Sequence, residues 1–385
     1  MAARIRAISA NAALGVASVV LALAVAEVVV RLVAPQQLVT LRPDIWQPLD
    51  SVGWRFRPNV HASYSTGERR VHIVTDSSGF RTSMAGRPLG RRRILLIGDS
   101  FMAAVQVEYE ASLAGLLEAR LPSVLGYPVE IWNSGQVAWD PPQYYLQEQQ
   151  SLRRSRFDLI VVSLYLGNDI VTRWPASIRP RQPEVVHRLR LPRRLSKREL
   201  VDALLYPLND YLEVHSELFI LLKTRMQSAL MRLGLTARYL PSEFLRSDST
   251  SSGWHVTTEI CEAMASTAHR YRVPVVFVLV PTPFQTHRAV FGSYARAFKI
   301  DPASVDLDQP TRLMGDSLRA HGLLTLNALP GFRAAADSGA QLYGHVDPHL
   351  SPAGHDILER LVEPTVAGIL RAARQDGSQA SGPEE

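Results

Sequence analysis

A serine follows a short apolar run in a pattern that can present a nucleophile. Residues 94–101 read Ile-Leu-Leu-Ile-Gly-Asp-Ser-Phe, so the apolar run leads directly into Gly98-Asp99-Ser100. The run is typical of a buried strand, and a glycine at its carboxyl end lets the chain turn sharply. Such a turn places Ser100 at the carboxyl edge of a parallel sheet, where open α/β folds bind ligands. Ser100 is therefore a candidate nucleophile, and the alternative is an ordinary helix N-cap.

A serine hydroxyl needs a base to become a nucleophile. The best candidates lie near the C-terminus, in Gly-His-Val-Asp-Pro-His-Leu-Ser-Pro-Ala-Gly-His, where Asp347 and His349 are two residues apart. In this turn-rich loop His349 can accept the serine proton, and Asp347 can fix the histidine tautomer and stabilise the imidazolium. His355 falls in the first turn of a predicted helix, where we expect a structural role. His345 has no assigned role.

The same loop allows a second interpretation, a metal site. His345, Asp347 and His349 occupy alternating positions and are all possible metal ligands. A loop whose alternate residues converge on one ion also needs outer partners that orient those ligands. We therefore keep the metal site as the less favoured hypothesis.

Two further segments could stabilise the oxyanion that acyl transfer creates. Asn133-Ser134-Gly135 follows the predicted strand 128–132, and Gly167-Asn168-Asp169 follows the predicted strand 158–164. The backbone N–H groups of Ser100 and Gly135 and the side-chain amide of Asn168 are candidate donors. The alternatives are that Gly135 makes a tight turn and that Asn168 caps a helix or a loop.

Strand and helix patterns alternate from about residue 90. The predicted strands are 94–97, 128–132, 158–164, 274–280 and 323–327. The predicted helices are 111–121, 142–154, 255–271, 308–321 and 354–373. Continuous β-branched runs suit central parallel strands that are covered on both faces, and strict alternation with helices predicts a doubly wound α/β sheet.

The ordered set of motifs resembles the SGNH/GDSL hydrolase family over about residues 90–372. Gly-Asp-Ser follows the first strand, a glycine the second, Leu166-Gly167-Asn168-Asp169 the third, and an Asp/His pair precedes the last helix. The resemblance implies a flavodoxin-like α/β/α sandwich with a parallel sheet of about five strands, and esterase chemistry. By matching positions, Ser100 resembles the nucleophile, His349 the base, and Gly135 and Asn168 the oxyanion-hole residues.

The last motif departs from the usual family pattern. The aspartate commonly stands three residues before the histidine, whereas Asp347 and His349 are two apart. This Asp-x-His spacing resembles the related alginate O-acetylation proteins. It leaves two reactions open: ester hydrolysis, and O-acetyl transfer to an envelope polysaccharide by the same residues. A non-catalytic binding module with the same fold is the third, less favoured possibility.

A second Gly-Asp-Ser triplet tests how specific the first one is. Gly315-Asp316-Ser317 lies inside a helical pattern, from Leu313 to Ala320, and no predicted strand precedes it. We therefore reject Ser317 as a nucleophile. The triplet is informative only in its structural context.

The N-terminus predicts a membrane helix. Arg4 and Arg6 precede an uncharged run from Ala7 to Ala26, and apolar character continues through Val33. A run of about 20 such residues can cross a bilayer, and the flanking arginines favour a cytoplasmic N-terminus. A cleaved signal peptide is the alternative. We expect a single-pass protein of the bacterial inner membrane with its catalytic domain on the periplasmic side, like the membrane-anchored subset of the family.

The expected organisation has four parts. Residues 1–34 form the anchor, 35–90 a small Pro/aromatic-rich extension, 91–373 the hydrolase-like domain and 374–385 a disordered tail. A long insertion, about 170–253, interrupts the domain and could cover the site or rest on lipid headgroups. The equally favoured alternative is a solvated basic loop followed by an ordinary packing helix. The first part of the insertion is rich in arginine, and its second part, about 198–233, has helical periodicity.

Composition limits the partners. The 385 residues carry a formal net charge of +6, which favours anionic surfaces. The sequence contains no zinc-finger spacing, RNA-binding aromatic motif or Gly-Lys-Ser/Thr phosphate loop, so we expect neither a nucleic-acid partner nor a cofactor. The single cysteine, Cys261, falls within a predicted helix and is expected to be a buried apolar residue. The expected substrate is an O-acylated cell-envelope glycan or a lipid, and nothing in the sequence indicates the oligomeric state.

Overall fold

The computed structural model covers the sheet, its helices and most of the N-terminal region. The described residues are 2–34, 36, 42–49, 52–65, 68–90, 92–171, 211–212, 215–233, 240, 242–246, 252–298, 300–345 and 347–379.

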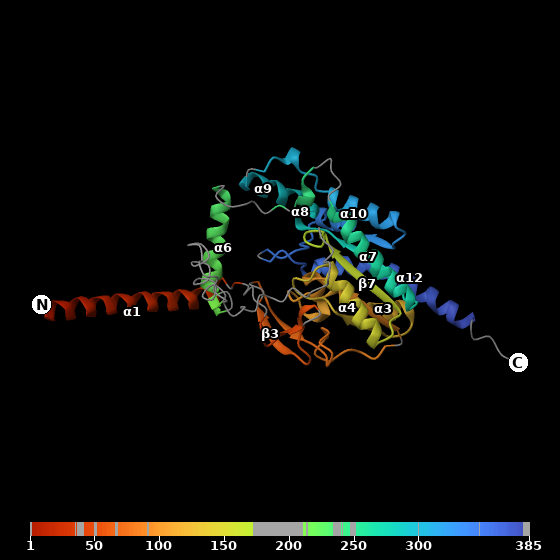
Figure 1. The fold of residues 1–385 in the computed structure, drawn as a ribbon, viewed down its shortest axis with the longest axis horizontal. Coiled ribbons are helices and arrows are strands. Elements are labelled where there is room, and N and C mark those ends of the chain that lie inside the picture. Colours follow the sequence, from red (N-terminus) through yellow and green to blue (C-terminus); the bar gives the residue numbers. More distant parts are fainter. Residues whose placement is uncertain are drawn as a thin grey trace, which may run out of the picture.

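A five-stranded parallel sheet forms the centre of the molecule (Figure 1). Its strands are β5 (Arg92–Ile97), β6 (Val129–Asn133), β7 (Leu159–Tyr165), β8 (Val275–Val280) and β9 (Thr325–Asn327). They lie in the order β6-β5-β7-β8-β9, and each neighbouring pair is parallel. The chain moves outward from β5 to β6 and then returns past β5 to β7, so the strand order reverses between β5 and β7. Ligands of such sheets bind outside the carboxyl ends of the strands at this reversal.

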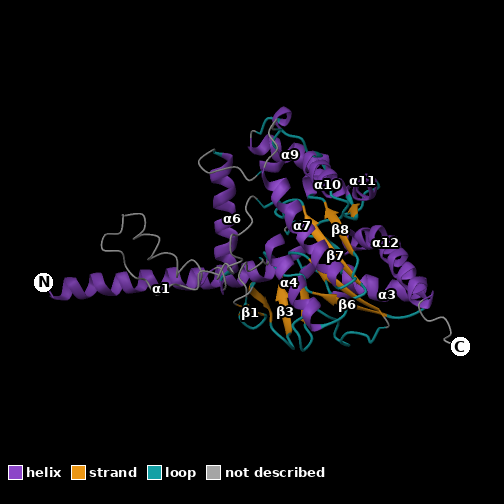
Figure 2. Ribbon diagram, turned by 45° about the vertical axis from the view of Figure 1, so that its right-hand side comes forward, coloured by secondary structure: helices purple, strands orange, loops and turns teal. Residues whose placement is uncertain are grey.

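Helices cover both faces of the sheet (Figure 2). One face packs on α3 (Leu113–Leu125), α11 (Leu329–Asp337) and α12 (Pro352–Gln379), and the other on α4 (Pro141–Arg154), α7 (Ser252–Arg270) and α10 (Gln309–Ala320). Successive strand residues alternate between these layers: Leu96 and Val161 face the first, and Leu95 and Ile160 face the second. All four side chains are buried, which explains why the strands read as continuous apolar runs.

Two antiparallel hairpins precede the sheet. They pair β1 (Trp46–Leu49) with β2 (Gly53–Phe56) and β3 (His61–Ser65) with β4 (Arg70–Val74). Their apolar side chains form a small core with Ala103 and Val105, which follow the candidate nucleophile in the chain. The hairpin region therefore packs directly against the segment that carries Ser100.

The N-terminal helix α1 (Ala2–Val33) projects from the body of the molecule (Figure 1). Its segment Ala13–Val33 has a mean hydropathy of 2.5, and most of its side chains are exposed, although Val30 is buried. Length and composition make it the one described helix that could cross a membrane. Next to its C-terminal end lies α6 (Glu217–Arg232), a helix of the long insertion.

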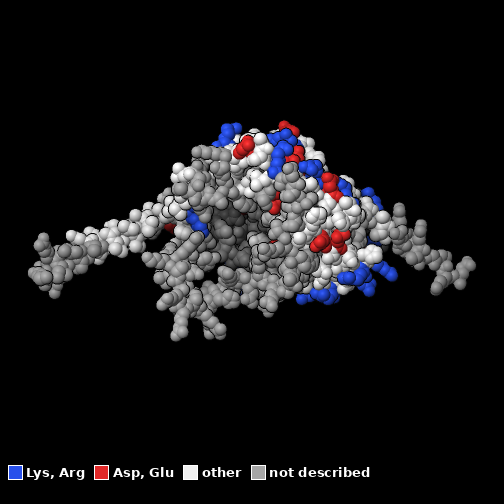
Figure 3. Space-filling model, turned by 45° about the horizontal axis from the view of Figure 1, so that its top comes forward, with Lys and Arg blue, Asp and Glu red and all other residues white. Residues whose placement is uncertain are grey.

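Short elements complete the described fold. They are α2 (Ser100–Ala103), α8 (Pro283–Thr286), α9 (Arg288–Phe298) and single 3-10 turns at Tyr109–Ala111, Ser242–Phe244 and Pro302–Ser304. On the face drawn in Figure 3, the described basic and acidic side chains are interspersed rather than separated.

The five predicted strands and five predicted helices are all found, with shifts of a few residues at their ends. Cys261 is buried in α7, as expected. One difference concerns the tail: α12 continues to Gln379, whereas disorder was predicted from residue 374. Polar residues can extend an established helix, because each added residue contributes one further backbone hydrogen bond. Residues 380–385 and the arginine-rich part of the insertion, 172–210, lie outside the described residues.

Candidate active site

Ser100 is the first residue of α2, directly beyond the end of β5. Asp99 caps this helix by accepting a hydrogen bond from the Phe101 N–H at 2.8 Å. Gly98 is required at the turn, because a Cβ there would lie 2.5 Å from the Met102 side chain. The turn thus holds Ser100 at the carboxyl edge of the sheet, with 7% of the residue exposed.

His349 lies within hydrogen-bond distance of the serine. Its Nε2 is 2.7 Å from the Ser100 Oγ, although the two residues are 249 positions apart in the chain. Its Nδ1 faces the Asp347 Oδ1 in a short hydrogen bond, and its backbone N–H donates to the same oxygen at 3.1 Å. The structure therefore joins Ser100, His349 and Asp347 in one continuous chain of hydrogen bonds.

Asp347 is held in its ionised form. Burial alone would raise the pKa of its carboxyl group, but the hydrogen bonds and charge of His349 outweigh burial and lower it below its usual value. An ionised carboxylate next to Nδ1 keeps the proton on that nitrogen and leaves Nε2 as the acceptor. This is the tautomer that can take a proton from Ser100.

The candidate oxyanion donors lie around the same turn. Asn168 follows β7 and donates one amide N–H to the Asp99 Oδ2 at 3.3 Å. Its amide carries a second N–H, which can point toward a bound oxyanion. The Gly135 N–H instead donates to the Asn133 Oδ1 at 3.0 Å, and the Asn133 amide donates to the Met102 carbonyl at 2.8 Å. Asn133 therefore ties the segment after β6 to α2 and occupies the Gly135 N–H in this structure.

Gly135 also allows two backbone segments to pack closely. A Cβ at this position would lie 2.4 Å from the backbone nitrogen of Ala103, so the segment after β6 touches the backbone of α2. Only a residue without a side chain allows this contact.

Two buried carboxyl groups lie beneath the turn. Burial raises the pKa of Asp99 to about 6, although the hydrogen bond from Phe101 and the charge of His349 oppose the shift. Burial also raises the pKa of Asp169, and the nearby Asp99 carboxyl adds to the effect. Asp169 accepts hydrogen bonds from the Tyr144 hydroxyl at 2.8 Å and the Tyr165 N–H at 2.7 Å, which fix the turn that carries Asn168.

A buried arginine supports the segment after Ser100. Arg81, on the loop beyond β4, is fully buried and donates to the carbonyl oxygens of Ala103 at 2.7 Å and Val107 at 2.6 Å, and also to that of Ala104. Ala104 adopts a left-handed conformation with φ of 50°, which ends α2. The guanidinium thus satisfies three carbonyls at the point where the chain leaves the site.

The hairpin region also reaches the loop that carries Asp347 and His349. The Asp347 N–H donates to the Glu68 Oε1 at 3.2 Å. On the other side of the site, the Phe101 ring lies 4.8 Å from the His349 ring and stacks on Tyr165 at 3.8 Å. His349 is therefore held between an acidic partner, the serine and an aromatic side chain.

The other histidines of the C-terminal motif lie elsewhere. His355 is buried in the first turn of α12, and its Nδ1 accepts a hydrogen bond from the Leu113 N–H at 3.3 Å, consistent with the predicted structural role. His345 is exposed. Both ring nitrogens of His349 are engaged with Ser100 and Asp347, which argues against its use as a metal ligand. Ser317 lies in α10 and bonds with the Thr258 hydroxyl at 2.8 Å.

Sequence reasoning missed Arg81, Asn133 and Glu68. Asn133 was part of a highlighted motif, so its position before Gly135 was the available signal. Arg81 and Glu68 belong to the hairpin region, and no local pattern indicates that they reach the site.

Comparisons with known proteins give matches among solved structures only. No family model matches the chain, and no curated protein matches it. A structure named TesA is 13% identical, with a TM-score of 0.37, and the match covers 72% of this chain and 99% of that one. A catalytic mutant of Axe2, an acetylxylan esterase from Geobacillus stearothermophilus, is 13% identical with a TM-score of 0.37, covering 71% and 92%. A lipolytic G-D-S-L family protein from Veillonella parvula is 10% identical with a TM-score of 0.34, covering 70% and 94%. The similar solved structures thus include a member of the lipolytic G-D-S-L protein family and an acetylxylan esterase.

Proposed function

We propose that the chain is a serine ester hydrolase of the SGNH/GDSL type. The observation that carries the proposal is the hydrogen-bonded series Ser100–His349–Asp347 at the carboxyl edge of the sheet. A nucleophile, a base within 2.7 Å and a carboxylate that orients the base are the three parts that acyl transfer from an ester requires.

The first half-reaction forms an acyl-serine. The Ser100 Oγ attacks the ester carbonyl carbon while His349 Nε2 takes the hydroxyl proton. The resulting tetrahedral intermediate collapses with cleavage of the bond to the leaving alkoxide, and His349 returns the proton to that oxygen. Asp347 stays ionised and stabilises the imidazolium that exists between the two proton transfers.

Oxyanion stabilisation is assigned to the Ser100 N–H, the Asn168 amide and the Gly135 N–H. Asn168 is the best-placed side chain, because one of its N–H groups remains available beyond its bond to Asp99. Gly135 would share its N–H between the Asn133 oxygen and the oxyanion. Donors fixed in a largely buried site stabilise developing charge without having to reorganise.

The second half-reaction removes the acyl group. A water molecule gives its proton to His349 and attacks the acyl carbon, the Ser100–acyl bond breaks, and Ser100 recovers its proton from His349. If a sugar hydroxyl replaces water, the same steps give O-acyl transfer. We propose hydrolysis as the reaction, and product analysis with acceptor glycans present distinguishes the two outcomes.

The site is proposed to work outside the cytoplasm, tethered to the bacterial inner membrane through α1. The apolar, largely exposed segment Ala13–Val33 supports an anchor, and the arginines before it favour a cytoplasmic N-terminus. The proposed substrate is an O-acylated envelope glycan or a lipid.

Ester hydrolysis by paired serine variants tests the proposal. The full-length protein in detergent should cleave a chromogenic acetyl ester, and Ser100→Ala should abolish turnover. Ser317→Ala removes the serine of the same triplet in α10 and should leave turnover unchanged. Equal activity of wild type and Ser100→Ala would refute the assignment.

A further inference from the structure

The helix α6 is fastened to the end of the N-terminal helix. The Glu27 carboxylate of α1 accepts hydrogen bonds from the Ser216 hydroxyl at 2.7 Å and from the N–H groups of Glu217 and Leu218, both at 3.0 Å. One turn further along α1, Arg31 donates to the His215 carbonyl at 2.6 Å and pairs with Glu27. A carboxylate on free N–H groups is a stabilising helix cap, so the start of α6 is fixed to α1.

The two helices run in crossing directions. In Figures 1 and 2, α6 extends across the direction of α1, on the side of the body from which α1 leaves. A helix that crosses a bilayer runs close to the membrane normal. If α1 crosses the membrane, as the proposed function has it, α6 therefore lies along the membrane surface.

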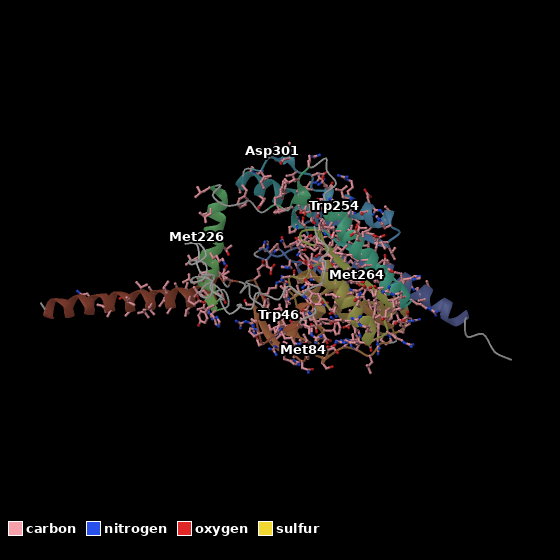
Figure 4. The ribbon with its side chains drawn as sticks, viewed as in Figure 1. Trp46, Met84, Met226, Trp254, Met264 and Asp301 are labelled. Carbon is pink, nitrogen blue, oxygen red and sulfur yellow. The ribbon has the colours of Figure 1, made fainter. Side chains whose placement is uncertain are left out.

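One face of α6 carries an apolar stripe without a partner in the described chain. The stripe consists of Leu222, Met226 and Ala229, together with Leu233 directly after the helix. These residues are spaced by four, three and four positions, so that they lie on one side of α6. All four are exposed, with 57% of Leu222, 60% of Met226 and 72% of Leu233 open. By contrast, Ile220 on the inner side is buried. Figure 4 shows Met226 on α6, apart from the main body, whereas Met264 lies within it.

Basic residues flank the stripe. Lys223 and Arg225 lie on either side of it by helical spacing, and Arg225 is exposed. A helix with an apolar face bordered by basic residues is suited to the boundary between lipid headgroups and acyl chains. Basic side chains also gain from anionic headgroups at the membrane surface.

We propose that α6 lies in the outer surface of the same membrane that α1 crosses, with the stripe against the lipid and Lys223 and Arg225 among the headgroups. This proposal rests on the membrane anchor of the proposed function. The occupant of the stripe is a lipid surface, because the cap on Glu27 places the helix where α1 ends. The carboxyl edge of the sheet, which carries Ser100, would thereby be held at a fixed orientation to the membrane.

Site-specific fluorescent labelling tests the proposal in the full-length chain. Cys261 is the single native cysteine and is fully buried, so an introduced surface cysteine can be labelled selectively. We would label Met226→Cys, Thr224→Cys and Val20→Cys in phosphatidylcholine/phosphatidylglycerol nanodiscs with an environment-sensitive dye. Thr224 is the matched control, because it is exposed on the opposite face of α6, and Val20 reports insertion of α1.

Quenching by nitroxide groups on the lipid acyl chains gives the result. The proposal predicts blue-shifted emission and loss of most fluorescence at positions 226 and 20, with little loss at 224. If the label at position 20 is quenched but the label at 226 is quenched no more than the label at 224, the membrane position of α6 is overturned and the anchor stands. A blue shift at 226 without quenching would indicate a protein partner on the stripe and would also overturn it. Absence of quenching at position 20 would refute the membrane anchor, and with it this proposal. Ester hydrolysis measured on the same sample tests the catalytic assignment separately.

Discussion

Glu148 should make the protein less stable as the pH rises. This α4 side chain is fully buried, and neither carboxyl oxygen has a hydrogen-bond partner in the part of the chain that the structure describes. Burial raises the pKa of Glu148 to about 9, from 4.5, and the charge of Arg270 opposes the shift only weakly. The folded protein therefore keeps this carboxyl protonated at neutral pH, whereas the unfolded chain ionises it above its ordinary pKa.

The size of the effect follows from proton linkage. Between the two pKa values the folded state binds one more proton than the unfolded state, so the free energy of unfolding falls by about 1.4 kcal/mol per pH unit. From about pH 5.5 to about pH 8 the Glu148 carboxyl alone lowers the free energy of unfolding by ~3 kcal/mol. Glu148→Gln resembles the protonated carboxyl at every pH. We expect the stability advantage of the variant over wild type to grow by ~3 kcal/mol between about pH 5.5 and about pH 8.

Denaturant unfolding of the full-length protein in detergent, followed by tryptophan fluorescence, measures the difference. Other buried acids such as Asp169 contribute equally to the pH dependence of both proteins. The difference in free energy of unfolding between wild type and variant therefore reports the contribution of Glu148. Glu262→Gln on α7 is the matched control, because 43% of the Glu262 side chain is exposed. A difference between wild type and Glu148→Gln that stays constant across this pH range would refute the reasoning.

Three further predictions concern the site. Asp347→Asn should lower kcat by ~10⁴ with little change in KM, because the new amide would donate to His349 Nδ1 and leave the ring proton on Nε2. A loss below about tenfold in steady-state assays would show that Asp347 does not fix the tautomer of His349. Asn168→Ala should lower kcat by ~10²–10³ as an oxyanion donor, and an effect on KM alone would argue against that role. Arg81→Lys should lower the melting temperature and kcat together, because a single ammonium nitrogen cannot take the place of the two guanidinium nitrogens that bind the carbonyls of Ala103, Ala104 and Val107. Unchanged values in thermal unfolding and ester assays would show that the three bonds are dispensable.

The sheet and the candidate residues at its edge could be predicted largely from the order of motifs along the chain. Parallel strands bring their carboxyl ends to one edge, so side chains after successive strands converge there whatever their separation in sequence. Asp99, after β5, and Asn168, after β7, are in hydrogen-bond contact for this reason. His349 reaches Ser100 from the loop between α11 and α12. The two-residue Asp347–His349 spacing also works geometrically, since one carboxylate oxygen accepts both the ring and the backbone N–H of His349.

The supporting contacts could not be predicted, because they depend on how the hairpin region docks. Arg81 lies in a loop and belongs to no sequence motif. Only the three-dimensional structure shows that it is buried against the carbonyls at the end of α2. Glu68 reaches Asp347 from the hairpin β3–β4 in the same way. Gly135 was expected to donate to an oxyanion, but the sequence does not show that Asn133 already accepts its N–H. Contacts of this kind carry no periodicity and leave no local signature.

Covalent labelling of Ser100 measures directly whether His349 activates this serine. A fluorophosphonate reacts with a serine that a histidine has activated, and trypsin would release Ser100 in the peptide from Ile94 to Arg120. We expect mass spectrometry to find the phosphonyl group on Ser100, His349→Ala to abolish the adduct, and Ser317→Ala to retain it. An adduct at another serine, or full labelling of Ser100→Ala, would show that Ser100 is not the activated serine.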